Sequence, residues 1–212
     1  PVGSLLGTLD IDSVNNGNLE DVLLGSVSWL RPANAKSRSS PDGFGPINLT
    51  AFGGWHRLPD FAPHHVLNML LDDKAVLTFR EGGLSTASIN PDVPEFVILL
   101  GNKPSLPAAL SSGNPGSVKI TSLNAKTGLF TGTFTLEDTE LRTGPAFAGK
   151  KLKRTATFSG IFTQDSMGPG GVGHFLLPEM PKDAVISDPP SPATTPTTTK
   201  ILSGNLLMEK KI

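Results

Sequence analysis

The densest group of oxygen-bearing side chains in the sequence lies near its N-terminus. Calcium takes about six to eight oxygen ligands, and a turn rich in Asp and Asn can supply them. The spacing departs from that of an EF-hand, because Val14 and Leu23 stand where ligands belong. Two interpretations stay open, a calcium site and an ordinary polar hairpin turn. The candidate ligands are Asp10, Asp12, Asn15, Asn16, Asn18, Glu20 and Asp21.

A second group of residues has the character of a ligand-binding site. Sugar-binding β modules expose Trp or Tyr as flat stacking surfaces. The chain has two Trp and no Tyr. Trp55 is followed directly by His56 and Arg57, and Phe44 lies in a loop rich in Pro and Gly. These four residues are candidates for contacting a ligand, with the alternative that Trp55 and Phe44 cover the core. Trp29, in an alternating segment, is expected in the core.

No motif in the sequence is a catalytic signature. A Gly-x-Ser-x-Gly nucleophile motif is missing. The chain has no Cys, which excludes thiolate nucleophiles and thiolate metal sites. His64 and His65 are adjacent, and neighbours in a strand point to opposite faces, so we do not expect both to bind one zinc ion. Acidic residues for a glycosidase are present, but the sequence does not pair them. We therefore name no catalytic residue and lean towards a non-enzyme.

The elements that must position these residues are predicted to be β-strands. In residues 129–136, Phe130, Phe134 and Leu136 alternate with Thr and Gly, which is typical of a half-buried antiparallel strand. Only residues 64–71 have helical spacing, and a strand competes there. We expect an all-β, antiparallel barrel or sandwich with little helix. The clearest strand segments are residues 5–11, 23–30, 47–52, 75–79, 96–100, 118–123, 129–136, 155–163, 173–177 and 201–208.

Two motifs recur along the chain at an interval of more than a hundred residues. An Asn-Gly turn at residues 15–17 leads into Gly-Ser-Val-Ser-Trp at 25–29, as the turn at 126–128 leads into Gly-Thr-Phe-Thr-Leu at 132–136. A Gly-to-Leu-Pro spacing is shared by residues 54–59 and 173–178. We interpret these as two related halves, residues 1–110 and 111–188, joined in one compact domain.

The last part of the chain has two sections of contrasting character. Residues 189–199 consist almost entirely of Pro and Thr, which predicts an extended strap with no apolar face. Residues 200–212 are apolar and strand-like, so segment 201–208 should complete a sheet edge. Pairing within the chain is the favoured version. The alternative is donation of this strand to a neighbouring copy, which would make a filament or lattice subunit.

Several of these motifs together resemble a known type of module. The motifs are Gly-Ser-Val-Ser-Trp at 25–29, Pro-Asp-Gly-Phe-Gly at 41–45, Gly-Leu-Phe-Thr-Gly at 128–132 and the glycine-rich run at 171–178. They resemble the uncharacterised β-rich C-terminal modules of very large secreted or surface proteins of environmental bacteria. The resemblance implies an extracellular or cell-surface location and a place among other modules. It implies no activity and no functional residues.

Composition and charge limit the kinds of partner expected for this chain. A net charge of −1 offers no basic face for nucleic acid, and no apolar run approaches the roughly 18 residues of a membrane helix. The chain begins with Pro1, so we expect a piece of a longer product. We expect a non-catalytic structural or adhesive module that contacts other modules or copies of itself. The alternative is a carbohydrate-binding module or glycan-active hydrolase, with extracellular polysaccharide as the partner.

Overall fold

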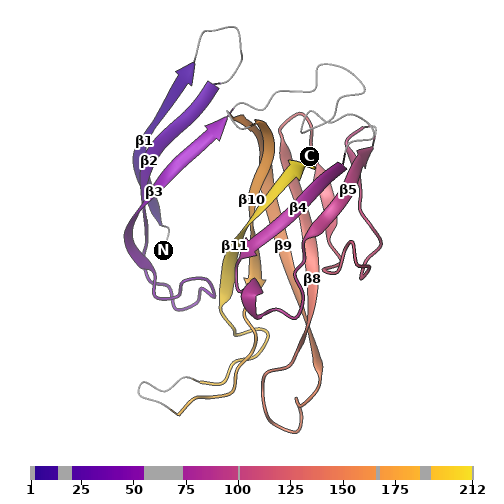
Figure 1. The fold of residues 1–212 in the computed structure, drawn as a ribbon. Helices are drawn as coiled ribbons and strands as arrows, with labels where there is room; N and C mark the ends of the chain where they lie inside the picture. The colour runs from indigo at the N-terminus through magenta and orange to yellow at the C-terminus, as the bar shows by residue number, and fades with distance from the viewer. Residues whose placement is uncertain are drawn as a thin grey trace.

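The structure is a computed structural model that describes residues 3–13, 21–54, 74–99, 101–165, 168–186 and 192–211. These residues form eleven strands and one turn of 3-10 helix, η2 (Leu84–Thr86), and contain no α-helix. All strand pairs are antiparallel, in one sheet of three strands and one of eight (Figure 1). The predicted all-β, antiparallel fold is confirmed. Each of the ten predicted strand segments falls on a strand, and the short β6 (Lys103–Ser105) was not predicted.

The three-stranded sheet, here called the small sheet, is a meander of β1 (Ser4–Ser13), β2 (Asp21–Arg31) and β3 (Phe44–Gly54). Directly opposed residues share a face of a sheet, so the register defines the two faces. One face carries only apolar residues and glycine from Leu5 to Ile11 on β1, opposite Leu23 to Trp29 on β2. This apolar face comprises Leu5, Leu9, Ile11, Leu23, Val27, Trp29, Ile47, Leu49 and Ala51.

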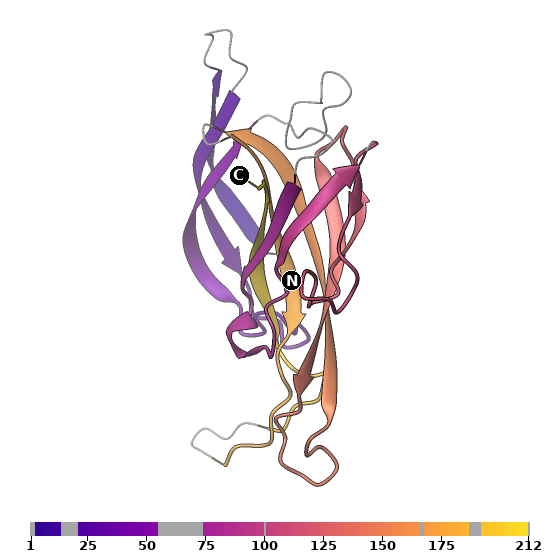
Figure 2. The same ribbon diagram turned by 45° about the vertical axis from the view of Figure 1, so that its right-hand side comes forward.

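The larger sheet has the order β6-β5-β4-β11-β10-β9-β8-β7. Its two end strands, β6 and β7, contact each other, so the sheet curves into a nearly closed barrel (Figure 2). The small sheet lies beside this barrel, with β3 near β9 and β1 on the far side (Figure 1). The remaining strands are β4 (Lys74–Glu81), β5 (Val93–Leu99), β7 (Lys119–Leu123), β8 (Leu129–Thr139), β9 (Lys151–Asp165), β10 (Gly168–Pro178) and β11 (Ile201–Lys210).

Phenylalanine side chains fill the barrel interior. Phe79 meets Phe134 at 4.8 Å and Phe175 at 5.8 Å between ring centroids. Several of these rings lie opposite a glycine of the next strand, because the register pairs Phe158 with Gly132 and Phe175 with Gly204. A Cβ at Gly132 would fall only 2.2 Å from the Phe158 ring. Glycine at these positions therefore leaves the space that each ring occupies.

β11 is a central strand of the barrel. It pairs with β10 through Phe175 and Gly204 and with β4 through Leu206 and Phe79, so both of its edges are used within the chain. The section before it is less extended than its composition predicts. The amides of Thr198 and Thr199 both donate to the Thr195 carbonyl at 3.0 Å and close a turn. Threonine hydroxyls stabilise this turn, since Thr198 Oγ1 accepts from the Thr195 amide at 2.8 Å.

One buried ion pair joins three parts of the barrel. Arg154 Nε donates to Asp138 Oδ2 at 2.9 Å, and Nη2 lies 2.8 Å from the same oxygen without hydrogen-bond geometry. Asp138 Oδ1 accepts from the Ser88 amide, and Arg154 Nη1 donates to the Pro178 carbonyl. Both side chains are only 3% exposed. An unpaired charge at this depth would be costly, and here each residue neutralises the charge of the other.

The proposed duplication stays a prediction. Residues 25–29 lie on β2 of the small sheet, and the matching residues 132–136 lie on β8 of the barrel. Residues 173–178 lie on β10, but residues 55–59 of the matching motif lie outside the described part of the chain.

Candidate binding groove

A groove of about 680 Å³ lies between the small sheet and the outside of the barrel. β2 and β3 contribute Trp29, Phe44 and Ile47 to one wall, and β10 and β11 contribute Leu176 and Leu202 to the other. Trp29 and Ile47 stand opposite each other in the register of the small sheet, so both belong to its apolar face. The volume falls within the range of about 300–1,000 Å³ typical of small-molecule sites.

Trp29 and Phe44 form the aromatic end of this groove. Their ring centroids are 4.7 Å apart with the planes at 82°, an edge-to-face contact. The prediction that Trp29 is a core residue is wrong. It is 38% exposed, because its face of β2 turns towards the groove and away from the barrel interior. The candidate Phe44 is half-buried, so it both lines the groove and packs on Trp29.

The loop of residues 32–43 closes one end of the groove and is anchored to the barrel. Arg38 Nε donates to the Thr199 carbonyl at 2.8 Å, and Nη2 donates to the Pro196 carbonyl at 2.9 Å. The amide of Ile201 donates to the Arg38 carbonyl at 2.9 Å. Arg38 thereby joins the loop to the start of β11. These bonds span more than 150 residues of sequence, which is why no local pattern indicated them.

A second arginine shapes the same loop from inside. Arg31 Nη2 donates to Ser37 Oγ at 2.7 Å, and Nη1 donates to Ser39 Oγ at 3.3 Å. Ser37 Oγ in turn donates to the Ser39 carbonyl at 2.7 Å. These partners are neutral, so the positive charge of Arg31 has no carboxylate partner among the described residues.

A second lobe of about 490 Å³ continues the groove past the loop. Pro41 and Lys200 line both lobes and mark where they meet. The second lobe carries more charged side chains than the first, with Lys36, Arg38 and Lys182 among its walls. The aromatic side chains of the groove thus lie in the first lobe, and most of its charged side chains lie in the second.

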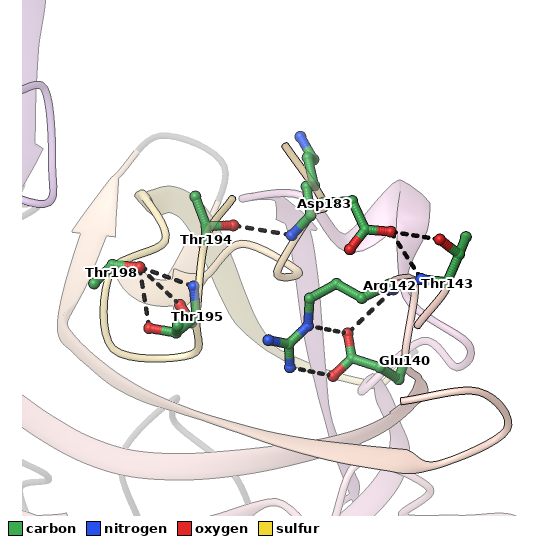
Figure 3. A network of polar contacts seen from close by, with 8 residues as sticks. Glu140, Arg142, Thr143, Asp183, Thr194, Thr195 and Thr198 are labelled. Atoms are coloured by element: carbon green, nitrogen blue, oxygen red, sulfur yellow. Dashed lines mark hydrogen bonds and ion pairs between the residues drawn. The ribbon is translucent and has the colours of Figure 1, made fainter. Parts of the chain in front are cut away.

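Hydrogen bonds hold the wall of the second lobe in place (Figure 3). The amide of Lys182 donates to Thr194 Oγ1 at 2.9 Å, which fixes the chain entering the threonine turn. Asp183 Oδ2 accepts from the amide and the hydroxyl of Thr143, both at 2.8 Å. These two bonds lower the pKa of the Asp183 carboxyl, because they stabilise its charged form.

A neighbouring pair stiffens the hairpin that carries Thr143 (Figure 3). Arg142 Nη2 donates to Glu140 Oε2 at 2.8 Å and Nε to Oε1 at 3.1 Å, a bidentate contact. This hydrogen bond lowers the pKa of the Glu140 carboxyl and raises the pKa of Arg142. Arg142 also lies over the Phe147 ring at 3.7 Å from its centroid. The wall of the second lobe is therefore supported by a fixed loop.

The two lobes carry more positive than negative side chains. Five cations line them against three carboxylates, an excess opposite in sign to the net charge of −1 of the chain. Lys182 pairs with Glu179 at 2.6 Å, so that pair is neutral. The cations are Arg31, Lys36, Arg38, Lys182 and Lys200, and the carboxylates are Asp42, Glu179 and Asp183.

Most of the candidate site residues lie outside this groove or outside the described residues. Trp55, His56 and Arg57 are not among the residues that the structure describes, so their assignment stays a prediction. His174 lies within β10 and lines the groove. Of the candidate calcium ligands, Asn15, Asn16, Asn18 and Glu20 also lie outside the described residues.

The remaining candidate ligands belong to the first hairpin. Asp10 and Asp12 are two residues apart on β1, and Asp21 begins β2 opposite Ser13. Within the described ranges, no group of three or more His, Cys, Asp or Glu side chains could hold a metal ion. Calcium binding by this hairpin therefore stays a prediction.

Comparison with family models, curated proteins and solved structures finds no match for this chain. In the ranges that the structure describes, no helix has the length and apolarity needed to cross a membrane. The groove combines large apolar side chains with a few charged ones, which is typical of ligand-binding sites. Sequence reasoning missed Arg38, Leu176, Lys200 and Leu202, because four separate segments meet to form it.

Proposed function

We propose that this chain is a non-catalytic structural module that assembles with a second copy of itself through strand β1. The observation that carries the proposal is the long, apolar and unpaired outer edge of β1. β1 is the end strand of the small sheet, and over the described residues it pairs only with β2. A free strand edge presents unpaired backbone groups that can add a further strand.

The side chains of β1 reinforce this interpretation. Proteins protect free edges with charged side chains, especially Lys, and with Pro or bulges. β1 contains no Lys, Arg or Pro, and its two charged residues, Asp10 and Asp12, lie in its second half. Leu5, Leu6, Leu9 and Ile11 are all at least half exposed, so both faces of the strand present apolar surface. Exposed apolar surface of this extent marks an interaction site. Because both edges of β11 are paired within the chain, β1 replaces segment 201–208 as the strand offered for assembly.

The order of residues along β1 favours a second copy as the partner. Two antiparallel β1 strands related by a two-fold axis at Thr8 would place Gly7 opposite Leu9 of the other copy and Leu5 opposite Ile11. The same pairing of glycine with a large side chain occurs within the chain, where Leu9 opposes Gly25 and Gly7 opposes Val27. Asp10 would face Leu6 of the other copy, so the two Asp10 carboxylates would not oppose each other.

A matched pair of lysine substitutions tests the assembly. Leu9 and Leu129 are both 52% exposed on strands, Leu9 at the β1 edge and Leu129 on β8 of the barrel. We expect the wild-type chain to form a dimer at high concentration in sedimentation velocity, since one strand edge is small beside the about 1,600 Å² of a standard interface. Leu9→Lys should abolish the dimer and Leu129→Lys should leave it. A monomeric wild type at all concentrations would refute the proposal.

A disulfide experiment tests the register. The chain has no cysteine, so a single introduced thiol can only cross-link two copies. Opposed residues of antiparallel strands have Cα atoms about 4.5–5.5 Å apart, within the range of about 4.4–6.8 Å for disulfides. Thr8→Cys should therefore form a covalent dimer on mild oxidation. Leu6→Cys is the control, because it would lie about 13 Å from its own copy at 3.3 Å per residue. Equal cross-linking of both variants would contradict this register.

The expected setting of this assembly is extracellular. It rests on the resemblance to modules of large bacterial surface proteins. In that setting, self-pairing of β1 would join neighbouring polypeptides, which fits a structural or adhesive role.

A further inference from the structure

We propose that the two-lobed groove binds an anionic amphiphile, a molecule with an apolar body and a single carboxylate or similar acidic group. The apolar body lies in the first lobe, between Trp29, Ile47 and Leu202. The acidic group lies where the lobes meet, at Lys200. This site is separate from the β1 edge and does not depend on the proposed assembly.

The first lobe is suited to an apolar body. Its walls carry five large apolar side chains, and two of them, Trp29 and Phe44, form an edge-to-face pair that fixes the ring positions. Trp29 and Ile47 lie on the apolar face of the small sheet, and Arg31, at the end of β2, is the one charged residue of β1–β3 that lines the lobe in the described ranges. Burying apolar ligand surface against these walls supplies affinity without specific orientation.

The junction of the lobes supplies the orientation. Lys200 lines both lobes, and its ammonium group has no carboxylate partner among the described residues. Its backbone is fixed on both sides, because the Glu179 amide donates to the Lys200 carbonyl at 2.8 Å and Ile201 is bound to Arg38. Lys36, in the second lobe, is likewise exposed and has no acidic partner in the described ranges. A bound carboxylate would therefore meet a positive potential that the chain does not neutralise itself.

The excess of cations and the apolar walls together distinguish this ligand class from a purely apolar or a purely acidic molecule. An apolar ligand without an acid would leave the excess of cations uncompensated. An acid without an apolar body would leave Leu176 and Leu202 facing water. One molecule with both parts satisfies both halves of the groove.

The test uses the intrinsic fluorescence of Trp29. The chain has two tryptophans, so Trp55→Phe leaves Trp29 as the single reporter, and calorimetry of the wild-type chain shows whether this change alters binding. We expect titration with dodecanoate to shift the Trp29 emission in a saturable manner, with one site per chain by isothermal titration calorimetry. Dodecanol, which has the same chain without the charge, should bind about tenfold more weakly or worse, a difference of about 1.4 kcal/mol.

Charge-removing variants locate the acidic group. Lys200→Gln should weaken dodecanoate binding by about tenfold and should leave dodecanol binding unchanged. Lys126→Gln is the matched control, because Lys126 is exposed in the turn between β7 and β8, far along the chain from the groove lining. Leu9→Lys changes the β1 edge and no residue of the groove lining, so it should bind dodecanoate like the parent. This variant therefore tests ligand binding independently of the proposed dimer.

Three results would overturn the proposal. The first is equal affinity for dodecanoate and dodecanol, and the second is an equal effect of Lys200→Gln and Lys126→Gln. The third is several weak sites per chain that Leu9→Lys reduces, which would indicate adsorption on the exposed apolar sheet. Far-ultraviolet circular dichroism of each variant shows that it retains the wild-type fold.

Discussion

The pairing of glycine with phenylalanine inside the barrel can be tested by adding a single methyl group. Gly160 on β9 lies opposite Phe130 on β8. A Cβ at this position would fall 2.3 Å from Phe130 Cζ and 2.5 Å from the Val172 carbonyl oxygen. Gly160 is not among the glycines with positive φ, so the constraint is space and not backbone conformation. Gly160→Ala therefore isolates the effect of overpacking.

The expected loss of stability follows from the small freedom of the atoms around the added methyl group. The Phe130 ring is fully buried and packs on Phe162 at 4.9 Å between centroids. The second obstacle is a backbone oxygen, so rotation of the ring alone does not relieve the contact. Overpacking of a filled core costs about 1–3 kcal/mol. In a chain of this length each 1 kcal/mol shifts the melting temperature by about 2–4 °C, which predicts a decrease of about 2–12 °C.

Two further glycines on β10 calibrate the result. A Cβ at Gly171 would lie 2.8 Å from Phe162 Cε1, and its nearest neighbours include no backbone atom, so Gly171→Ala should cost less than Gly160→Ala. A Cβ at Gly170 meets nothing within 4 Å. Gly170→Ala should be neutral or stabilising by up to about 1 kcal/mol, because it reduces the freedom of the unfolded chain.

The assay is thermal and urea unfolding followed by far-ultraviolet circular dichroism, which reports the whole β structure. A double variant, Gly160→Ala with Phe130→Leu, should cost less than the sum of the two single changes, because the smaller side chain makes room for the methyl group. Equal stability of Gly160→Ala and Gly170→Ala would refute the reasoning. So would strictly additive effects in the double variant.

Three other perturbations address the ion pair, an acid-sensitive contact and the last strand. Arg154→Met should lower the free energy of unfolding by about 3–5 kcal/mol, because Asp138 stays buried without its partner; urea unfolding that shows less than 1 kcal/mol of loss would contradict this. Hydrogen bonds from Lys211 and Lys74 lower the pKa of Glu95 from 4.5 to about 2, so this exposed group stabilises the fold above pH 4.5 and loses that contribution as the pH falls towards 2. Glu95→Gln should therefore flatten the acid side of the stability profile between those pH values, whereas an unchanged profile would show that the contact contributes nothing. Removal of residues 201–212 takes a central strand from the barrel, and the truncated chain should lose its cooperative unfolding transition; a cooperative transition near the wild-type temperature would argue against that role.

Local patterning was enough to predict ten of the eleven strands in the described residues. On β8, Phe130, Phe134 and Leu136 are all fully buried, as the alternation with Thr and Gly predicts. The turn at residues 126–128 contains Gly128 with φ of 70°, a conformation that glycine adopts without strain. These features depend on neighbours within a few residues, which is the range over which sequence patterns carry information.

The division into a small sheet and a barrel depends on contacts that no local pattern contains. β2 and β8 have similar alternation and a central glycine, yet one lies in the open sheet and the other in the barrel. For this reason Trp29 was expected in the core, although its apolar face turns to the groove. The buried ion pair did have a local signal. Asp138 continues the inward series of Phe134 and Leu136, and Arg154 precedes Ala156 and Phe158 in the same way, so charges at inward positions of two paired strands indicate a buried pair.

The groove and the barrel share the residues that begin β11, and this couples them energetically. Arg38 binds the carbonyls of Pro196 and Thr199, and Ile201, the first residue of β11, donates to Arg38. Opening the groove widely would pull on these bonds, and fraying the start of β11 would release the loop that closes the groove. A ligand bound at Lys200 contacts only the state in which both are formed. By mass action it would stabilise the start of β11 as well as the loop, so the loop of the small sheet and this central strand of the barrel should respond to the same ligand.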